Sequence, residues 1–432
     1  MKKTSFLFLL FASYIAIAQQ VTTLAGNGPG YNDGPIATSY FKNPADICAG
    51  TSGVFYIADG SNNCIRKIDT NLDWVSTVAG VSAEGFQDGP AATAKFSSPY
   101  GICIDSQGNL FVVDWGNFKI RKISPAGIVS TFAGSTQGYT DGVGTTAQFN
   151  YMGDICIDAQ DNLYLADEGN NRIRKITPTG IVSTLAGSTE GYANGQGASA
   201  KFYWPRGICI EPSTNNLFVV ETGGAKVRKI TPDGTVSFIA GGIVPGSTSG
   251  YLDGVGTAAK FNFPVAISID TLGNLYVSDT SNHRIRKVTQ TGIVTTYAGS
   301  TAGYTDGWGT IAQFAAPYGS CIVNNIIYLT EGSGNCRIRV IDTPLKNENF
   351  NYLQIKLHPN PSKNGSFNLF YTNNYNTFVT IEIFDSTSKL VYSQDKVLVN
   401  NTNINTNLEK GLYFVKIFTE NNQTQTVKFI VK

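Results

Sequence analysis

Charge of either sign is scarce in this sequence. Asp, Glu, Lys and Arg make up only 15% of its 432 residues, and the formal net charge is +1. Loss of Lys2 and Lys3 with a leader would make it −1, since 30 basic and 31 acidic residues would remain. Electrostatic binding to nucleic acid or to an anionic membrane needs an excess of basic residues, so we expect neither partner.

Two further features are missing. No Gly-x-Ser-x-Gly motif occurs, so the nucleophile elbow of an α/β-hydrolase is not predicted. Beyond the first twenty residues no apolar run is long enough to span a bilayer, so no transmembrane segment is predicted.

The N-terminal segment MKKTSFLFLLFASYIAIAQQ predicts a signal peptide over residues 1–18, with cleavage before Gln19. It has a basic start, an apolar run and a small-x-small site at Ala16-Ile17-Ala18. A transmembrane anchor is the weaker alternative, because the run is short. No Cys follows the cleavage site, so a lipoprotein anchor is not expected.

The sequence is rich in internal repeats. GNNRIRKITPTGIVSTLAG at 169–187 recurs almost unchanged as GNFKIRKISPAGIVSTFAG at 116–134 and as SNHRIRKVTQTGIVTTYAG at 281–299. Six copies at a period near 54 predict a repeat architecture. The equivalent arginines of the copies are Arg66, Arg121, Arg174, Arg228, Arg286 and Arg339.

Each copy contains four short runs of β-type residues joined by tight polar turns, as in DICID, NLYLAD, RIRKIT and IVSTLAG. Four antiparallel strands repeated six times predict an all-β fold, a six-bladed β-propeller. A solenoid is the alternative, but it would need polar caps at both ends.

The two ends of the repeat region favour a closed ring. VTTLAG at 21–26 is a fourth strand with nothing before it, and the sixth copy stops after RIRVID without a fourth strand. Pairing the first with the last would remove both open edges. We therefore expect the N-terminal strand to close a propeller over 19–342.

The strings GNNRIRKI and SNHRIRKV and the GYxDGxG loops resemble NHL repeats of the bacterial extracellular kind, over about 21–342. The resemblance implies a propeller, and the family ranges from binding modules to lyases and lactonases. Related propeller lyases use several histidines, whereas this chain has only His283 and His358. We therefore favour a non-enzymatic protein; the alternative is a lactonase- or lyase-like enzyme with carboxylates at the channel mouth.

Composition changes after Asp342. A linker over 343–352 precedes a region, 353–432, that alternates apolar and polar residues and predicts a small β-sandwich. The landmarks LHPNPSKNG, IFDSTSKLVYS, NLEKGLYFVKI and VKFIVK resemble the C-terminal sorting domain of type IX secretion cargo. His358, where an aromatic is commoner, and STSK are mild departures, and a generic adhesion sandwich is the alternative.

The sorting resemblance implies a partner and a location. It implies binding to the type IX secretion machinery, export through the periplasm and outer membrane, and a secreted or cell-surface protein.

Two sets of acidic residues recur in the repeats, and we interpret both as scaffold. Residues of the first set follow the second strand and precede the repeated Arg, with which they could pair; a metal ring is the alternative. Residues of the second set lie in Asp-Gly turns, where calcium is the alternative. The sets are Asp59, Asp114, Asp167, Glu221, Asp279 and Glu331, and Asp33, Asp88, Asp141, Asn194, Asp253 and Asp306.

The seven cysteines do not form a disulfide framework. Five occupy one position of the first strand and are interpreted as small buried hydrophobes: Cys48, Cys103, Cys156, Cys209 and Cys321. Cys64 and Cys336 lie in the first and sixth repeats, and a disulfide between them is left open. Because seven is odd, at least one thiol has no intramolecular partner.

The copies disagree just before the first strand, where they read NPAD, SPYG, YMGD, WPRG, FPVA and APYG. In a propeller these positions lie at one mouth of the channel, so aromatic and charged residues at positions where the copies differ are candidates for ligand binding. The alternative for each is a packing role. Trp115 and Trp308, in neighbouring loops, each occur in one copy only and are added to these candidates. The predicted ligand-binding residues are Asp46, Tyr100, Trp115, Asp154, Trp204, Arg206, Trp308 and Tyr318.

The sequence therefore predicts a binding module for an extracellular protein or glycan, acting as a monomer. No catalytic or metal-ligating residue is predicted, and no cofactor, with a divalent metal such as calcium as the alternative.

Overall fold

The computed structural model describes residues 19–242, 249–332, 334–342, 356–363, 365–370, 377–387, 389–398, 401–419 and 424–432. The chain divides into a large unit, Ala18–Thr343, and a second unit that contains Pro344–Lys432. The predicted signal peptide, 1–18, and linker, 343–352, lie outside the described residues. Within the described part, no helix is long and apolar enough to cross a membrane.

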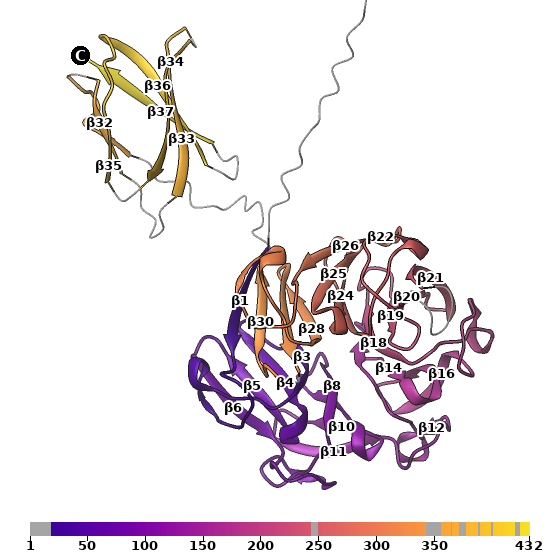
Figure 1. Cartoon of the computed structure of the whole chain (residues 1–432). Helices are drawn as coiled ribbons and strands as arrows, with labels where there is room; N and C mark the ends of the chain where they lie inside the picture. The colour runs from indigo at the N-terminus through magenta and orange to yellow at the C-terminus, as the bar shows by residue number, and fades with distance from the viewer. Residues whose placement is uncertain are drawn as a thin grey trace, which may run out of the picture. The chain divides into compact units, whose positions relative to one another are not determined.

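The large unit is all-β and consists of six five-stranded sheets in a propeller-like arrangement (Figure 1). The first sheet, in the order β2-β6-β5-β4-β3, has β2 (Gly34–Pro35), β3 (Pro44–Ala49), β4 (Val54–Asp59), β5 (Cys64–Asp69) and β6 (Trp74–Ala79). The second, β7-β11-β10-β9-β8, has β7 (Gly89–Pro90), β8 (Pro99–Ile104), β9 (Leu110–Asp114), β10 (Lys119–Ile123) and β11 (Ile128–Ala133). The third, β12-β16-β15-β14-β13, has β12 (Gly142–Val143), β13 (Ile155–Ile157), β14 (Leu163–Asp167), β15 (Arg172–Ile176) and β16 (Ile181–Gly187).

The other three sheets follow the same plan. The fourth, β17-β21-β20-β19-β18, has β17 (Gly195–Gln196), β18 (Pro205–Ile210), β19 (Leu217–Glu221), β20 (Lys226–Ile230) and β21 (Thr235–Gly241). The fifth, β22-β26-β25-β24-β23, has β22 (Gly254–Val255), β23 (Pro264–Ile269), β24 (Leu275–Asp279), β25 (Arg284–Val288) and β26 (Ile293–Ala298). The sixth, β27-β1-β30-β29-β28, has β1 (Gln20–Ala25), β27 (Gly307–Trp308), β28 (Pro317–Val323), β29 (Ile326–Glu331) and β30 (Ile338–Asp342).

Short 3-10 helices occupy the connections. Those between second and third strands are η2 (Gly60–Asn62), η3 (Trp115–Asn117), η5 (Glu168–Asn170) and η8 (Thr280–Asn282). Those that follow the two-residue strands are η1 (Ile36–Thr38), η4 (Gly144–Thr146), η6 (Gly197–Ser199), η7 (Gly256–Ala258) and η9 (Gly309–Ile311).

The expectation of four strands per sheet is wrong, because each of the six sheets has five. A two-residue strand from the GYxDG loop pairs with the outermost long strand, as Gly34 pairs with Val75 in the first sheet. The sequence pattern did not predict it because two residues are too few to show alternation.

Strand alternation builds the core between the sheets. In the run Ile-Arg-Lys-Ile of the third strand both isoleucines are buried, and so is the arginine. The cluster between the first two sheets takes Ile65 from one sheet and Phe96, Ile102 and Val112 from the next. Burying an apolar side chain of this size contributes about 1.5–3 kcal/mol, and each such cluster joins two neighbouring sheets.

The N-terminal strand belongs to the last sheet. β1 pairs antiparallel with β30, with Val21 opposite Ile341. The first strand of each sheet contacts the first strand of the next, and β28 contacts β3. The six first strands together line a channel of about 360 Å³.

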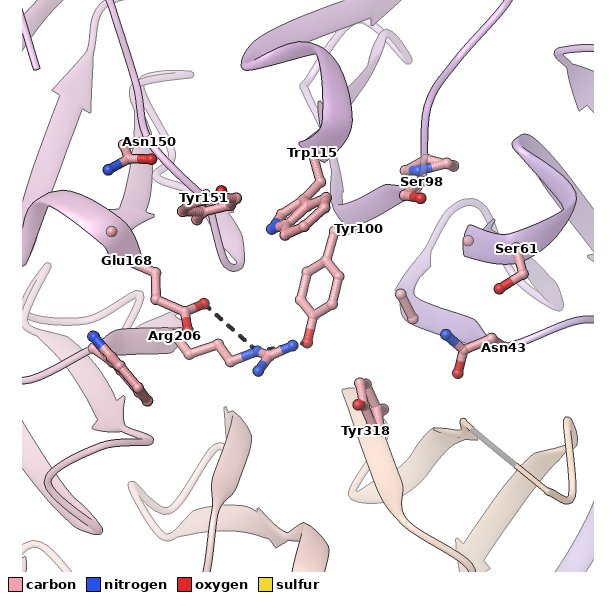
Figure 2. Close-up of a pocket in the computed structure, with 15 residues that line it drawn as sticks. Asn43, Ser61, Ser98, Tyr100, Trp115, Asn150, Tyr151, Glu168, Arg206 and Tyr318 are labelled. Carbon is pink, nitrogen blue, oxygen red and sulfur yellow. Dashed lines mark hydrogen bonds and ion pairs between the residues drawn. The ribbon is translucent and has the colours of Figure 1, made fainter. Parts of the chain in front are cut away.

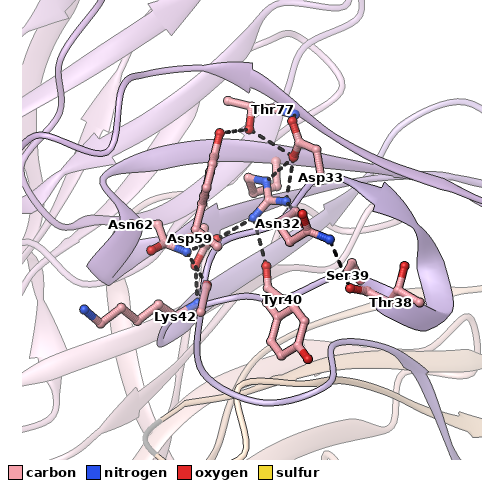
Figure 3. Close-up of polar contacts among 12 residues, drawn as sticks. Asn32, Asp33, Thr38, Ser39, Tyr40, Lys42, Asp59, Asn62 and Thr77 are labelled. Carbon is pink, nitrogen blue, oxygen red and sulfur yellow. Dashed lines mark hydrogen bonds and ion pairs between the residues drawn. The ribbon is translucent and has the colours of Figure 1, made fainter.

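A buried arginine at the same place in each sheet ties the repeat together (Figure 3). Arg66 donates through Nη1 to Asp59 at 2.9 Å and through Nη2 to Asp33 at 2.6 Å, and Asp33 also accepts from the Thr77 backbone N–H. A buried charge is costly unless it is paired and hydrogen-bonded, and this network meets that condition. The predicted pairing of the second-strand acid with the Arg is confirmed in all six sheets.

The same network explains the Asp-Gly turns. In five repeats the turn Asp pairs with the buried Arg, and in the fourth Asn194 Oδ1 accepts from Arg228 Nη2 at 2.8 Å. Both acidic sets are therefore occupied in binding the scaffold arginines.

All seven cysteines are free thiols, so Cys64 and Cys336 form no disulfide. The five cysteines of the first strands join the apolar clusters between neighbouring sheets, as Cys103 does beside Met152 and Ile155. Their interpretation as small buried hydrophobes is confirmed for Cys48 and Cys103, whereas Cys156, Cys209 and Cys321 are partly buried and all five border the channel.

The second unit has two sheets that share one core. The first is β31-β32-β35, with β31 (Lys356–His358), β32 (Phe367–Phe370) and β35 (Asn401–Ile404). The second is β34-β33-β36-β37, with β33 (Thr377–Asp385), β34 (Leu390–Leu398), β36 (Gly411–Thr419) and β37 (Thr424–Val431). Phe367 and Leu369 of the first sheet pack with Ile381, Val415 and Phe429 of the second, as in a β-sandwich.

Candidate functional site

In each of the six loops that enter the first strands, a backbone N–H donates a hydrogen bond to a buried acid, and four of the loops have a second such bond to a side chain. We call the first residue of each of the six tetrapeptides the mouth residue. The backbone N–H before each mouth residue donates to the buried acid of its own sheet, as Ser97 does to Asp114 at 2.7 Å. The scaffold network therefore also fixes the loops. The mouth residues are Asn43, Ser98, Tyr151, Trp204, Phe263 and Ala316.

Each mouth residue has a positive φ, between 44° and 54°. A side chain of the preceding sheet holds four of the six: the N–H of Ser98 donates to Asn63 and that of Trp204 to Asn171, both at 3.0 Å. That of Ala316 donates to His283 Nδ1 at 3.2 Å. The left-handed conformation costs about 1–2 kcal/mol for a non-glycine residue, so these contacts stabilise an otherwise strained backbone.

These loops and the turns between second and third strands enclose a cavity of about 550 Å³, which we call the mouth cavity (Figure 2). Its walls come from the first, second, third, fourth and sixth sheets. Glu168 and Trp115 enter it because each begins the 3-10 turn of its sheet. The lining residues are Asn43, Ala45, Gly60, Ser61, Ser98, Pro99, Tyr100, Trp115, Asn150, Tyr151, Glu168, Gly169, Trp204, Arg206 and Tyr318.

The residue that begins the turn after the second strand differs between the sheets. In the fourth and fifth sheets the residue that begins the turn is a threonine whose hydroxyl donates to the next sheet: Thr222 to Pro264 and Thr280 to Pro317, both at 2.7 Å. Neither threonine lines the mouth cavity.

Arg206 lies at the centre of the mouth cavity. Its Nε donates to Tyr100 Oη at 2.9 Å and lies 3.7 Å from Glu168 Oε2. Its guanidinium carbon lies 5.0, 5.6 and 5.9 Å from the ring centres of Tyr100, Phe263 and Tyr318. Cation–π contacts of this kind contribute about 0.5–2 kcal/mol each, so the guanidinium is held in one orientation.

Burial raises the pKa values of two groups beside this arginine. It raises the pKa of Glu168, although the charge of Arg206 opposes that rise. It also raises the pKa of Tyr100, which stays protonated at neutral pH.

Aromatic rings form the rim of the mouth cavity. The side chains of Tyr151 and Trp204 are 45% and 43% exposed. Trp115 lies against Tyr151, with ring centres 5.3 Å apart. Exposed rings beside a hollow with convergent polar groups are typical of a binding site.

Five predicted residues line this cavity together: Tyr100, Trp115, Trp204, Arg206 and Tyr318. Asn150, Ser61 and Gly169 line it too, although the sequence analysis did not select them. Their signal was position within the repeat: Ser61 and Gly169 lie in the turn after the second strand, as Trp115 does, and Asn150 directly precedes a mouth residue.

Asp46 and Asp154 lie elsewhere. They border the channel and hydrogen-bond to each other, with Asp46 only 6% exposed. Asp46 also accepts from the Ile102 N–H at 3.0 Å, and Asp154 from the Ile155 N–H at 2.7 Å. The expectation that they line the mouth cavity with the aromatic residues is therefore wrong: both carboxyls border the channel, where each lies beside the other and accepts a backbone N–H.

Small residues make room for this carboxyl pair. A Cβ on Gly101 would lie 3.1 Å from an Asp154 oxygen, and the space beside Gly319 is filled by Asp46. Burial, together with the neighbouring carboxyl, raises the pKa of Asp46 well above its usual range, and burial likewise raises that of Asp154.

Trp308 does not lie at the mouth either. It belongs to β27, at the edge of the sixth sheet opposite β28, and pairs with Gln20. The prediction for Trp308 is therefore wrong, because its loop forms the extra outer strand, which lies at the edge of the sheet away from the channel.

The described residues contain no group of three or more His, Cys, Asp or Glu side chains that could hold a metal ion. What the mouth cavity offers chemically is one fixed guanidinium, one carboxylate, several amides and hydroxyls, and aromatic faces.

Comparison with known protein families agrees with the repeats and the tail. The model described as "Teneurin NHL domain" matches residues 140–306, and the one described as "NHL repeat" matches 41–68. The model described as "Secretion system C-terminal sorting domain" matches residues 356–432. The last match indicates export and a secreted or cell-surface location.

Individual proteins resemble the repeat region. NHL repeat-containing protein 2 of Homo sapiens is 29% identical over 302 residues, which cover 61% of this chain and 41% of that protein. A Bacteroides thetaiotaomicron protein of unknown function is 23% identical with a TM-score of 0.57, and covers 75% of this chain and 76% of its own. An auxiliary nutrient binding protein of the same organism is 19% identical, with the same TM-score and coverage. At such identities the solved structures support the fold alone.

Proposed function

We propose that this NHL-repeat protein, which carries a C-terminal type IX sorting domain, is an exported binding module whose mouth cavity takes an extracellular ligand. The observation that carries the proposal is the cavity itself. Its walls combine residues found in single repeats, such as Trp115, Glu168 and Arg206, on loops that the repeated scaffold holds fixed.

The proposal includes a six-bladed propeller closed by the N-terminal strand. The pairing of β1 with β30 and the contact of β28 with β3 support it. A closed ring gives the loops of five sheets fixed positions around one cavity, which an open array of sheets would not.

Binding is favoured over lactonase- or lyase-like catalysis by the state of the carboxyl groups. Asp46 and Asp154, the residues that such an enzyme would use, bond to each other and to backbone N–H groups instead of lining the mouth cavity. Glu168, which does line it, is beside Arg206.

The test is capture of a ligand that depends on the mouth cavity. Mature protein would be used on a glycan array and in a pull-down from culture supernatant, and affinity for the captured species would then be measured. Replacing Trp204 and Arg206 by Ala is expected to weaken binding by about 1–3 kcal/mol each, as for other central interface residues. Trp308→Ala removes an exposed tryptophan outside the cavity and is the matched control. Unchanged affinity in the double variant would refute the proposal.

A further inference from the structure

We infer that the ligand of the mouth cavity is a neutral carbohydrate chain; the inference rests on the proposed binding function. Among the lining residues, Arg206 and Glu168 are the charged ones, and they carry opposite signs. Because Glu168 Oε2 lies 3.7 Å from Arg206 Nε, the pair attracts neither anions nor cations strongly.

The pair suits a hydroxyl group better than an ion. A carboxylate or phosphate that approached Arg206 would gain its attraction but meet the repulsion of Glu168. A hydroxyl can accept a hydrogen bond from the guanidinium and donate one to the carboxylate at the same time. Two adjacent hydroxyls, as on a sugar ring, match a donor and an acceptor that stand side by side.

Arg206 has donors left for such a ligand. Its Nε is used by Tyr100, while Nη1 and Nη2 have no acceptor among the described residues. The side chain is 17% exposed and is fixed among three rings. Little ordering entropy would be lost when these groups bind a ligand oxygen.

The other residues that line the mouth cavity are also suited to a neutral, hydroxyl-rich ligand. Asn43, Ser61, Ser98 and Asn150 are neutral groups that both donate and accept hydrogen bonds. Tyr151 and Trp204 present exposed faces at the rim, and the negative face of an aromatic ring attracts the polarised C–H groups of a sugar. The volume of about 550 Å³ is that of a small-molecule site.

The test compares neutral with acidic oligosaccharides on the mature full-length chain. The probes are cellohexaose, maltohexaose, mannohexaose and xylohexaose, with hexagalacturonate as the acidic counterpart, titrated by calorimetry and by tryptophan fluorescence. We expect at least one neutral probe to bind more tightly than hexagalacturonate, with little dependence on salt. Trp204→Ala should lower its affinity at least tenfold, and Trp308→Ala should not change it.

Glu168→Gln gives the sharpest arm of the test. Removing the carboxylate leaves Arg206 uncompensated, so the affinity for the neutral probe should fall while that for hexagalacturonate rises. Tighter binding of hexagalacturonate by the unmodified protein, or no binding of any neutral probe, would overturn the inference. If a ligand of another class were then captured and its binding depended on Trp204, the proposed function would stand while the carbohydrate inference fell.

Discussion

The Sγ atom of Cys336, in the sixth sheet, lies 3.3 Å from the backbone nitrogen of Asn43, in the first, and accepts its hydrogen bond. It occupies the place that Asn63 and Asn171 hold in their own sheets. The last sheet therefore supports the mouth residue of the first as the first, third and fifth sheets support those of the second, fourth and sixth.

Disrupting β1 should destabilise the large unit. Val21 is fully buried between the last two sheets, whereas Thr22 on the same strand is exposed. Val21→Asp should lower the thermal midpoint by several degrees, since burying an unpaired carboxylate costs a few kcal/mol. Thr22→Asp is the control and should leave it unchanged. Deletion of 19–26 should act like Val21→Asp, and an unchanged midpoint there would contradict closure by this strand.

His283 should make stability depend on pH. Its Nδ1 accepts the Ala316 N–H, and burial, with the charge of Arg284, lowers its pKa below 6.5. As the pH falls below 6.5, His283 therefore takes up a proton more readily in the unfolded chain than in the folded protein. The free energy of unfolding decreases accordingly. His283→Asn, which copies Asn63 and Asn171, should keep the hydrogen bond and remove this decrease. Denaturation from pH 7.5 to 5 measures it; identical slopes in both proteins would refute the assignment.

The Asp46–Asp154 pair should have the opposite effect. Because both pKa values are raised in the folded state, the fold retains a proton that the unfolded chain releases above about pH 4. Its contribution to stability is complete at low pH and is lost as the pH rises toward neutrality. Asp46→Asn places an amide donor where the shared proton lies, so the variant should gain stability relative to the parent as pH rises. A constant difference from pH 4 to 8 would show that the pair shares no proton.

Arg174 should matter to stability and not to the ligand. It pairs with Asp167 at 2.6 Å and with Asp141 at 2.7 Å, and its removal leaves Asp167 buried without its partner. Arg174→Ala should lower the free energy of unfolding by about 3–5 kcal/mol. Lys175→Ala, next to it and partly exposed, should have little effect. Chemical denaturation measures both, and an equal loss in the two variants would contradict a scaffold role.

The repeated part of the molecule could be predicted from the chain because it is encoded locally. Each Arg meets an acid seven or eight positions earlier on the neighbouring strand, so a short stretch of sequence contains both partners, as with Arg121 and Asp114. The sorting domain was likewise visible as a set of landmarks along the chain, from LHPNPSKNG to VKFIVK.

The site depends on distances that no local pattern contains. Whether Arg206 meets Tyr100 is set by how the second and fourth sheets stand around the channel. Asp46 and Asp154 looked like surface charges at the mouth, yet the missing side chains of Gly101 and Gly319 let them meet beside the channel. Trp308 was predicted at the mouth as a loop residue found in one repeat, yet it forms a two-residue strand at the edge of its sheet opposite β28. Sequence periodicity specifies which strand a residue joins, but the packing of whole sheets decides which side chains converge.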